Sequence, residues 1–154
     1  MTIELAVLRE SAAEDLPTDE EFGDWVSAAL DGADASFAIR LIDEEESRRL
    51  NSQYRGKDRP TNVLSFPAQL PGEVLEQLPV PPLGDLAICA PLVAREAGDQ
   101  GKPVRHHWAH LTVHGVLHLR GHDHEDPADA ERMESLEREL LAGFGIPDPY
   151  AGER

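Results

Sequence analysis

The 154-residue chain has one cysteine, no long apolar run and few basic residues. The single cysteine, Cys89, excludes an internal disulfide, and we expect it to be a small buried hydrophobe without a disulfide-linked partner. No apolar run approaches the roughly 18 residues of a membrane span. No basic segment followed by an apolar one has the pattern of a secretory leader. We therefore expect a cytoplasmic protein in which residues 1–154 form a single domain.

Basic residues are scarce, with 14 Lys and Arg against 30 Asp and Glu, and the formal net charge is −16. This excess of negative charge argues against a general polyanion-binding protein, whose surface would be basic. Charge alone favours a solvated face on which the basic side chains pair with nearby glutamates. Six basic residues nevertheless crowd into one short stretch: Arg40, Arg48, Arg49, Arg55, Lys57 and Arg59.

Apolar periodicity and helix-capping patterns predict an α+β fold, in which a mixed sheet of roughly four strands packs with about five helices. Thr18 with Glu21, and Asp43 with Glu46, have the spacing of helix caps. A proline-rich stretch, 67–84, indicates an exposed connection that either borders a cleft or only links two strands. The expected strands are 2–8, 37–41, 61–66 and 85–89, and the expected helices are 18–31, 43–53, 91–98, 103–120 and 127–142.

All seven histidines lie in one short stretch of the chain. His114 and His118 are four residues apart, so on a helix their rings lie on one face and can converge on one metal ion. A third ligand cannot come from the same unbroken helix, because eight residues rise roughly 12 Å along its axis. Gly121 allows the chain to turn back under the helix end. The spacing then leaves His122 and His124 as alternative third ligands.

Three protein ligands leave a fourth tetrahedral position for water, which is typical of a catalytic zinc site. The histidine spacing is similar to that of the zinc-binding helix of metzincin proteases. Gly115, however, stands where those proteins carry their glutamate general base. Peptide hydrolysis is therefore disfavoured, although a metal-bound water is still available as a nucleophile. Copper or nickel could outcompete zinc by affinity, and zinc is favoured because a tetrahedral imidazole site suits it.

The other polar residues of this stretch have more ordinary interpretations. His106, His107 and His110 lie one to two turns upstream, and we expect structural or supporting roles for them. Asp123 either holds a ligand imidazole through the second ring nitrogen or serves as a cap at the surface.

Three motifs in the right order resemble the bacterial YbeY family of ribosomal RNA maturation factors. The motifs are 50–67, 83–86 and 114–124, and the closing segment 148–150 agrees as well. The resemblance implies a single-strand-specific metallo-endoribonuclease. That family acts in maturation of the 3′ end of small-subunit ribosomal RNA and in late ribosome quality control, so single-stranded RNA and ribosomal particles are the implied partners.

The resemblance also implies the residues of the site. The family's ligands for one zinc ion fall on His114, His118 and His124, with zinc-bound water as the nucleophile, and its functional arginine falls on Arg55. A guanidinium can hold two oxygens of a phosphate as charge develops on it, which makes Arg55 the candidate for phosphate stabilisation. A track for further phosphates would consist of Arg40, Lys57 and Arg59.

Two other functions are compatible with the sequence. One is a non-catalytic ribosome assembly factor, in which zinc only clips the helix to the following turn. The other is a metal-dependent hydrolase of a different substrate, such as a peptide, against which Gly115 counts.

Overall fold

The structure is a computed structural model that describes residues 2–69, 71–122 and 126–151. Four strands form one sheet: β1 (Ile3–Arg9), β2 (Ala35–Ile42), β3 (Val63–Pro67) and β4 (Pro82–Cys89). Their order in the sheet is β1-β2-β4-β3. β1, β2 and β4 run parallel, whereas β3 pairs antiparallel with β4 at one edge. The predicted mixed sheet is therefore confirmed.

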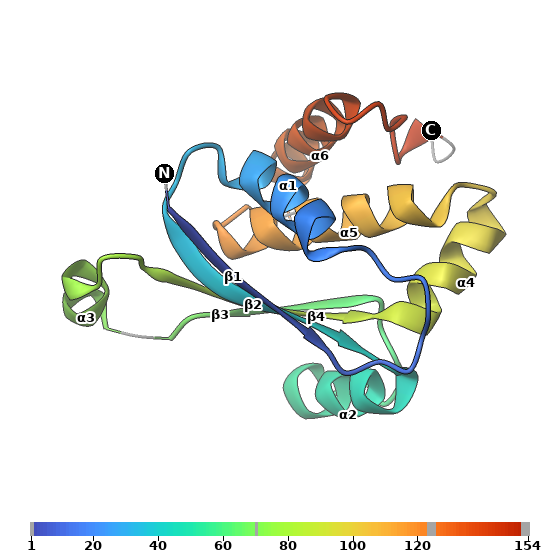
Figure 1. The fold of residues 1–154 in the computed structure, drawn as a ribbon, viewed down its shortest axis with the longest axis horizontal. Helices are drawn as coiled ribbons and strands as arrows, with labels where there is room; N and C mark the ends of the chain where they lie inside the picture. Colours follow the sequence, from blue (N-terminus) through green and yellow to red (C-terminus); the bar gives the residue numbers. More distant parts are fainter. Residues whose placement is uncertain (1, 70, 123–125, 152–154) are drawn as a thin grey trace.

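Helices cover the two faces of the sheet unequally (Figure 1). The described residues form α1 (Asp19–Leu30), α2 (Glu44–Arg55), α3 (Gly72–Gln77), α4 (Ala90–Gln100), α5 (Val104–Leu119) and α6 (Pro127–Ala142). α1 and α5 lie on one face with α6 above them, and α2 lies on the other face. α3 projects from one end of the molecule. No helix of the described ranges is long and apolar enough to cross a membrane.

The predicted elements are largely confirmed, with two corrections. α3 forms within the stretch that the sequence predicted as a connection without helix. Thr18 caps α1 as predicted, with its side chain accepting from the Glu21 N–H and the Glu21 side chain accepting from the Thr18 N–H. Asp43 precedes α2 but makes no capping bond. Its carboxylate instead accepts hydrogen bonds from Ser11 and Ala12 on the strand-to-helix connection, so a tertiary contact replaces the local cap.

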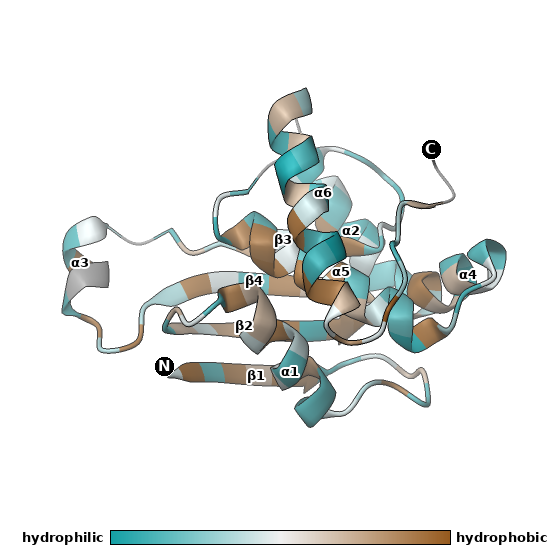
Figure 2. Cartoon of the chain, turned by 90° about the horizontal axis from the view of Figure 1, so that it is seen from above, coloured by the Kyte–Doolittle hydropathy of each residue, from teal (hydrophilic) through white to brown (hydrophobic). Residues whose placement is uncertain are grey.

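The two faces of the sheet carry different side chains, because successive strand residues point to opposite sides. Large residues such as Phe37, Ile39 and Leu86 are buried in the main core with residues of α1 and α5. Figure 2 shows hydrophobic residues along the strands, and many hydrophilic residues on the outer helices α4 and α6. On the face toward α2, one row across the register of the four strands is Ala6, Ala38, Asp85 and Phe66.

α2 covers only one end of this second face. Leu50 of α2 packs with Ile42, Leu64 and Ala87 in a small separate cluster. The neighbouring rows, with small or polar side chains, offer little apolar surface for another helix to bury. The rest of this face is therefore left as the floor of a groove.

Candidate metal centre and groove

α5 ends in the turn that the sequence predicts. Gly121 has a φ of 96°, in the left-handed region that glycine adopts at little cost. The Gly121 N–H donates to the His118 carbonyl (3.0 Å) and the His122 N–H donates to the Leu117 carbonyl (3.1 Å), which together make a Schellman motif. The chain therefore reverses at once and brings the His122 backbone back to the end of α5.

Both candidate ligand rings on α5 are held at the same ring nitrogen. His118 Nδ1 lies 3.0 Å from the carbonyl oxygen of His122, and His114 Nδ1 lies 2.5 Å from Oε1 of Glu137. A carbonyl or an ionised carboxylate can only accept, so Nδ1 carries the proton in both rings and Nε2 carries the lone pair. The ring planes differ by 18° and their centroids are 6.0 Å apart. With the proton on Nδ1, each ring is in the tautomer that binds a metal through Nε2.

Glu137 of α6 is a carboxylate with no exposed surface. Its Oε2 accepts a hydrogen bond from the hydroxyl of Tyr150 and lies 3.4 Å from Nε2 of His110. Burial by itself would raise the pKa of Glu137. The hydrogen bonds from His110, His114 and Tyr150 outweigh burial and lower the pKa from 4.5 to about 2. The carboxylate is therefore ionised at neutral pH and acts only as an acceptor.

His114 belongs to two candidate sets of metal ligands. Within the described ranges, His110, His114 and Glu137 offer ligand atoms within 4.8 Å of one another and could hold a metal ion. The sequence instead predicts His114, His118 and a third residue after Gly121. Two members of the predicted site, His124 and Asp123, lie outside the described residues.

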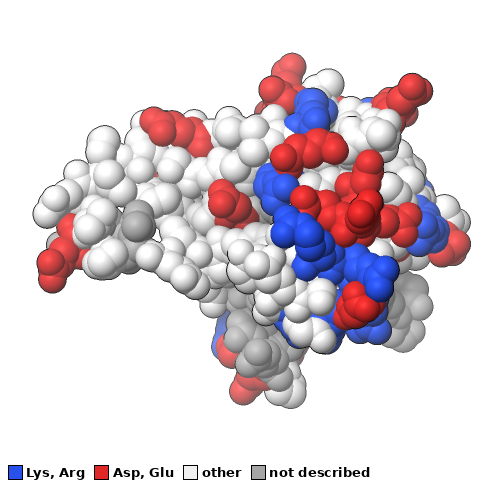
Figure 3. Space-filling view, turned by 90° about the horizontal axis from the view of Figure 1, so that it is seen from below, with Lys and Arg blue, Asp and Glu red and all other residues white. Residues whose placement is uncertain are grey.

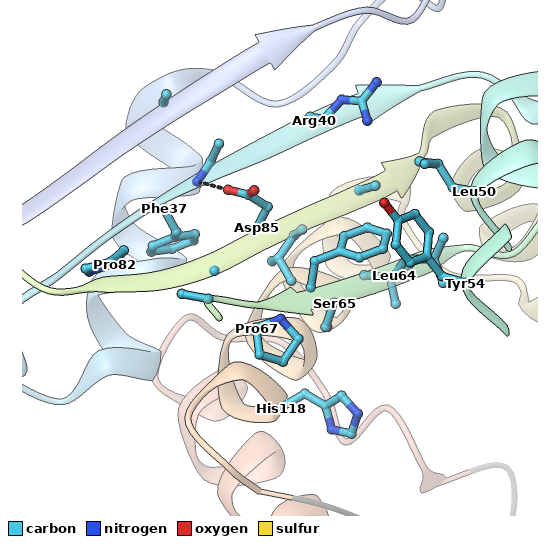
Figure 4. Close-up of a pocket in the computed structure, with 18 of the residues that line it drawn as sticks. Phe37, Arg40, Leu50, Tyr54, Leu64, Ser65, Pro67, Pro82, Asp85 and His118 are labelled. Atoms are coloured by element: carbon cyan, nitrogen blue, oxygen red, sulfur yellow. Dashed lines mark hydrogen bonds between the residues drawn. The ribbon is translucent and has the colours of Figure 1, made fainter. Parts of the chain in front are cut away.

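A groove of about 1630 Å³ runs over the open face of the sheet and reaches His114 and His118. Figure 4 shows Tyr54 and Asp85 over the sheet, and His118 beyond Pro67 at the edge formed by β3. Tyr54 is 63% exposed, and its ring meets Phe66 edge-on with 4.9 Å between centroids. The groove thus joins an exposed aromatic ring to the candidate metal ligands.

The basic stretch 40–59 divides into two groups in the structure. Arg40 pairs with Glu10 and Glu46, so the charge of this groove-lining guanidinium is largely neutralised. Two further ion pairs join Arg48 to Asp58 and Arg49 to Glu46. The exposed side chains of Arg55, Lys57 and Arg59 have no ion-pair partner among the described residues. Of these three, Arg55 lines the groove.

Figure 3 shows how charged side chains are distributed on the face seen from below. Lys and Arg gather over one half of this face and alternate with Asp and Glu, whereas the other half is mostly uncharged. Of the six basic residues, Arg40 and Arg49 pair with glutamates, as charge alone favoured, and Arg48 pairs with an aspartate. Of the residues predicted for a phosphate track, Arg40, Lys57 and Arg59, only Arg40 lines the groove.

Two of the three upstream histidines, His107 and His110, make contacts within the fold. His107 is 4% exposed, and its Nε2 lies 2.8 Å from Oε1 of Glu96, which also accepts from Asn62 at 3.0 Å. Burial lowers the pKa of His107, although the bond to Glu96 partly opposes this. His110 Nε2 lies 3.2 Å from the Tyr150 hydroxyl. Burial likewise raises the pKa of Cys89, the buried thiol that the sequence predicts.

Gly115 packs against the sheet. A Cβ atom at this position would lie 2.7 Å from Cδ2 of Leu86, which is fully buried on β4. The residue after His114 therefore faces the core, and a glutamate general base has no room there. The absence of the protease base, noted from the sequence, has a packing reason.

The sequence did not assign a role to Glu137, and it included Tyr150 only as part of a motif. A sign of Glu137 was available, because it lies four residues after Met133 and four before Leu141 on the buried side of α6. A charged residue on a buried helical face points to a buried partner. No local pattern links Tyr150 to α5, since their contact depends on how the chain returns after α6.

Comparisons with known proteins show which proteins the chain is similar to. A family model described as Endoribonuclease YbeY matches residues 9–145. Proteins of that name from Xanthomonas campestris pv. campestris (strain B100) and Stenotrophomonas maltophilia (strain K279a) are 58% and 60% identical over 141 residues. Each alignment covers 90% of this chain and 88% of the relative. The solution structure of TM1509 from Thermotoga maritima is 25% identical, with a TM-score of 0.58 over 91% of each chain.

Proposed function

The chain belongs to the YbeY endoribonuclease family, and from this membership we propose that it is a zinc-dependent endoribonuclease specific for single strands. Its substrate is small-subunit ribosomal RNA, which it cuts in maturation of the 3′ end. It also acts on ribosomal particles in late quality control, in the cytoplasm. The observation that carries the proposal is that His114, His118 and Arg55 line one groove.

The proposed ligands of one zinc ion are His114, His118 and His124, and the described part of this set, His114 and His118, fits such a site. The hydrogen bonds at Nδ1 give His114 and His118 the tautomer with a lone pair on Nε2. The turn at Gly121 brings His122 back to the end of α5. When bound in such a site, zinc supplies a water of lowered pKa and neutralises developing charge on a phosphate.

The chain's own part in the reaction is to bind and orient the phosphodiester. Arg55 is exposed at the end of α2, and the part of the chain that the structure describes gives it no acidic partner that would compete for its donors. A guanidinium can hold two oxygens of one phosphate, and this contact strengthens as the phosphate gains charge in the transition state. Arg55 thus has the chemistry to position the scissile phosphate within the groove.

Single-strand specificity follows from the floor of the groove. Small side chains such as Ala6 and Ala38 leave room over the sheet, and the exposed ring of Tyr54 offers a face on which an unpaired base can stack. A base inside a duplex is already stacked and paired, and does not present that face. With a net charge of −16, binding of RNA should be local and sensitive to salt.

Two observations weigh against the other functions considered from the sequence. A peptide hydrolase would need a base that the packing of Gly115 excludes. A purely structural zinc clip is unnecessary, because backbone hydrogen bonds already close the turn after α5.

The experiment that tests this function compares two arginines of α2. Arg55→Ala should lower kcat/KM on single-stranded ribosomal RNA by about 100-fold or more, since it removes one preorganised donor. Arg49→Ala is the matched control, because Arg49 lies on the same helix, pairs with Glu46 and does not line the groove. Cleavage is followed by end mapping on single-stranded and duplex RNA. Equal activity of the two variants, or equal cutting of duplex RNA, contradicts the proposal.

A further inference from the structure

The carboxylate of Glu137 has no role in the reaction as described, yet it is the most deeply buried acidic group of the described residues. Burying a carboxylate is costly unless several donors satisfy it. Nδ1 of His114 lies 2.5 Å from one carboxylate oxygen of Glu137. The other oxygen accepts a hydrogen bond from Tyr150 and lies 3.4 Å from Nε2 of His110. These partners come from α5 and from the segment after α6, so the carboxylate joins three separate parts of the chain.

The carboxylate of Glu137 could bind a metal ion directly or form a hydrogen bond to a ligand ring, and its distance from His114 bears on this choice. Two donors bound to one tetrahedral zinc, each about 2.0–2.1 Å from the ion, lie about 3.3 Å apart. The 2.5 Å between Nδ1 and Oε1 is instead a hydrogen-bond separation. In the structure, His114 and Glu137 are therefore hydrogen-bonded to each other, with Nδ1 as the donor.

We infer that Glu137, clamped by Tyr150, is a positioning residue that sets the tautomer and orientation of His114 so that Nε2 faces the metal. This inference rests on the proposed zinc site. A carboxylate behind a ligand imidazole increases the basicity of the ring and holds it in place. Nδ1 of His118 donates instead to a backbone carbonyl, a weaker acceptor than a carboxylate, so the two rings are held unequally.

The contact between Glu137 and Tyr150 also connects the segment after α6 to the proposed metal site. Tyr150 donates to Glu137 and its ring meets His110 edge-on, with 5.3 Å between centroids. The Asp148 side chain accepts from the Tyr150 N–H at 2.8 Å, which closes a local turn just before Tyr150. The family-like segment 148–150 thereby acquires a function in orienting a ligand.

Zinc affinity, measured by competition with a chelator on the full-length protein, tests the inference. Glu137→Gln keeps the shape of the side chain and should weaken zinc binding by about 10–100-fold. Tyr150→Phe removes only the hydroxyl and should cause a smaller loss in the same direction. Glu139→Gln is the matched control, an exposed glutamate two residues away on α6, and should bind as the wild type does.

Nitrogen NMR of the histidine rings in zinc-free protein gives a reading that a merely structural role would not change. Wild-type His114 should carry its proton on Nδ1, and Glu137→Gln should produce a mixture of tautomers, while circular dichroism verifies the fold of each variant. Wild-type affinity in both Glu137→Gln and Tyr150→Phe would overturn the inference.

Three alanine variants separate this inference from its premise. Direct binding by Glu137 predicts that His110→Ala abolishes zinc binding and that His118→Ala does not, and this result would overturn the positioning role. His114→Ala with wild-type affinity would overturn the proposed zinc site itself, and the inference with it.

Discussion

Histidines occur in both halves of α5, but their partners differ. In the first half, His107 is buried and bound to Glu96 of α4, and His110 contacts Tyr150. In the second half, His114 and His118 line the groove, each with Nδ1 donating to an oxygen. The same residue type therefore stabilises packing at one end of the helix and offers lone pairs at the other. The two halves differ in their access to the groove, because histidines in both halves contact an oxygen atom through one ring nitrogen.

The largest expected effect is on metal binding in the second half. His118→Ala should lower zinc affinity by more than the roughly 10–100-fold that loss of an outer hydrogen-bond partner costs. His107→Gln, which can still donate to Glu96, should leave zinc affinity unchanged. Chelator competition on both variants checks the contrast, and a similar loss in the two would break the division of α5.

An intermediate effect is expected at Gly115, in the second half of α5, where the helix packs against β4. Gly115→Ala should lower the free energy of unfolding by about 1 kcal/mol, because overpacking against Leu86 costs roughly 1–3 kcal/mol and the gain in helix propensity is about 1 kcal/mol. Chemical denaturation measures this change.

Gly98→Ala in α4 is the matched control. No atom outside the immediate chain lies within 4 Å of a Cβ placed there, so this variant should be stabilised by up to about 1 kcal/mol. A stabilised Gly115→Ala protein would show that α5 can move away from β4.

The smallest effect concerns pH and the first half of the helix. Burial lowers the pKa of His107 in the folded protein, whereas the unfolded chain has the ordinary value of about 6.5. As pH falls through that value, the unfolded state binds a proton that the folded state resists, so stability is lost. The stability of wild type relative to His107→Gln should therefore decline between about pH 7.5 and 5.5. Denaturation across this range tests the sign, and a constant difference would contradict it.

Local patterns in the sequence determined the elements of this protein and half of its candidate site. The Thr18 capping box, the left-handed Gly121 and the four-residue spacing of His114 and His118 each depend on residues within one or two helical turns. Such short-range geometry is fixed by the backbone itself, so it can be read without the fold. The resemblance to the family then indicated Arg55, which the structure places at the groove.

Only the tertiary structure decided which side chains meet. Glu137 and Tyr150 are 23 and 40 residues from their α5 partners His114 and His110, and the cap at Asp43 is lost to Ser11, 32 residues away. Likewise, only the structure shows that Arg40 pairs with Glu10, 30 residues away, whereas Arg55 has no acidic partner among the described residues. Such contacts depend on how whole elements pack, and burial then determines which polar groups must find partners.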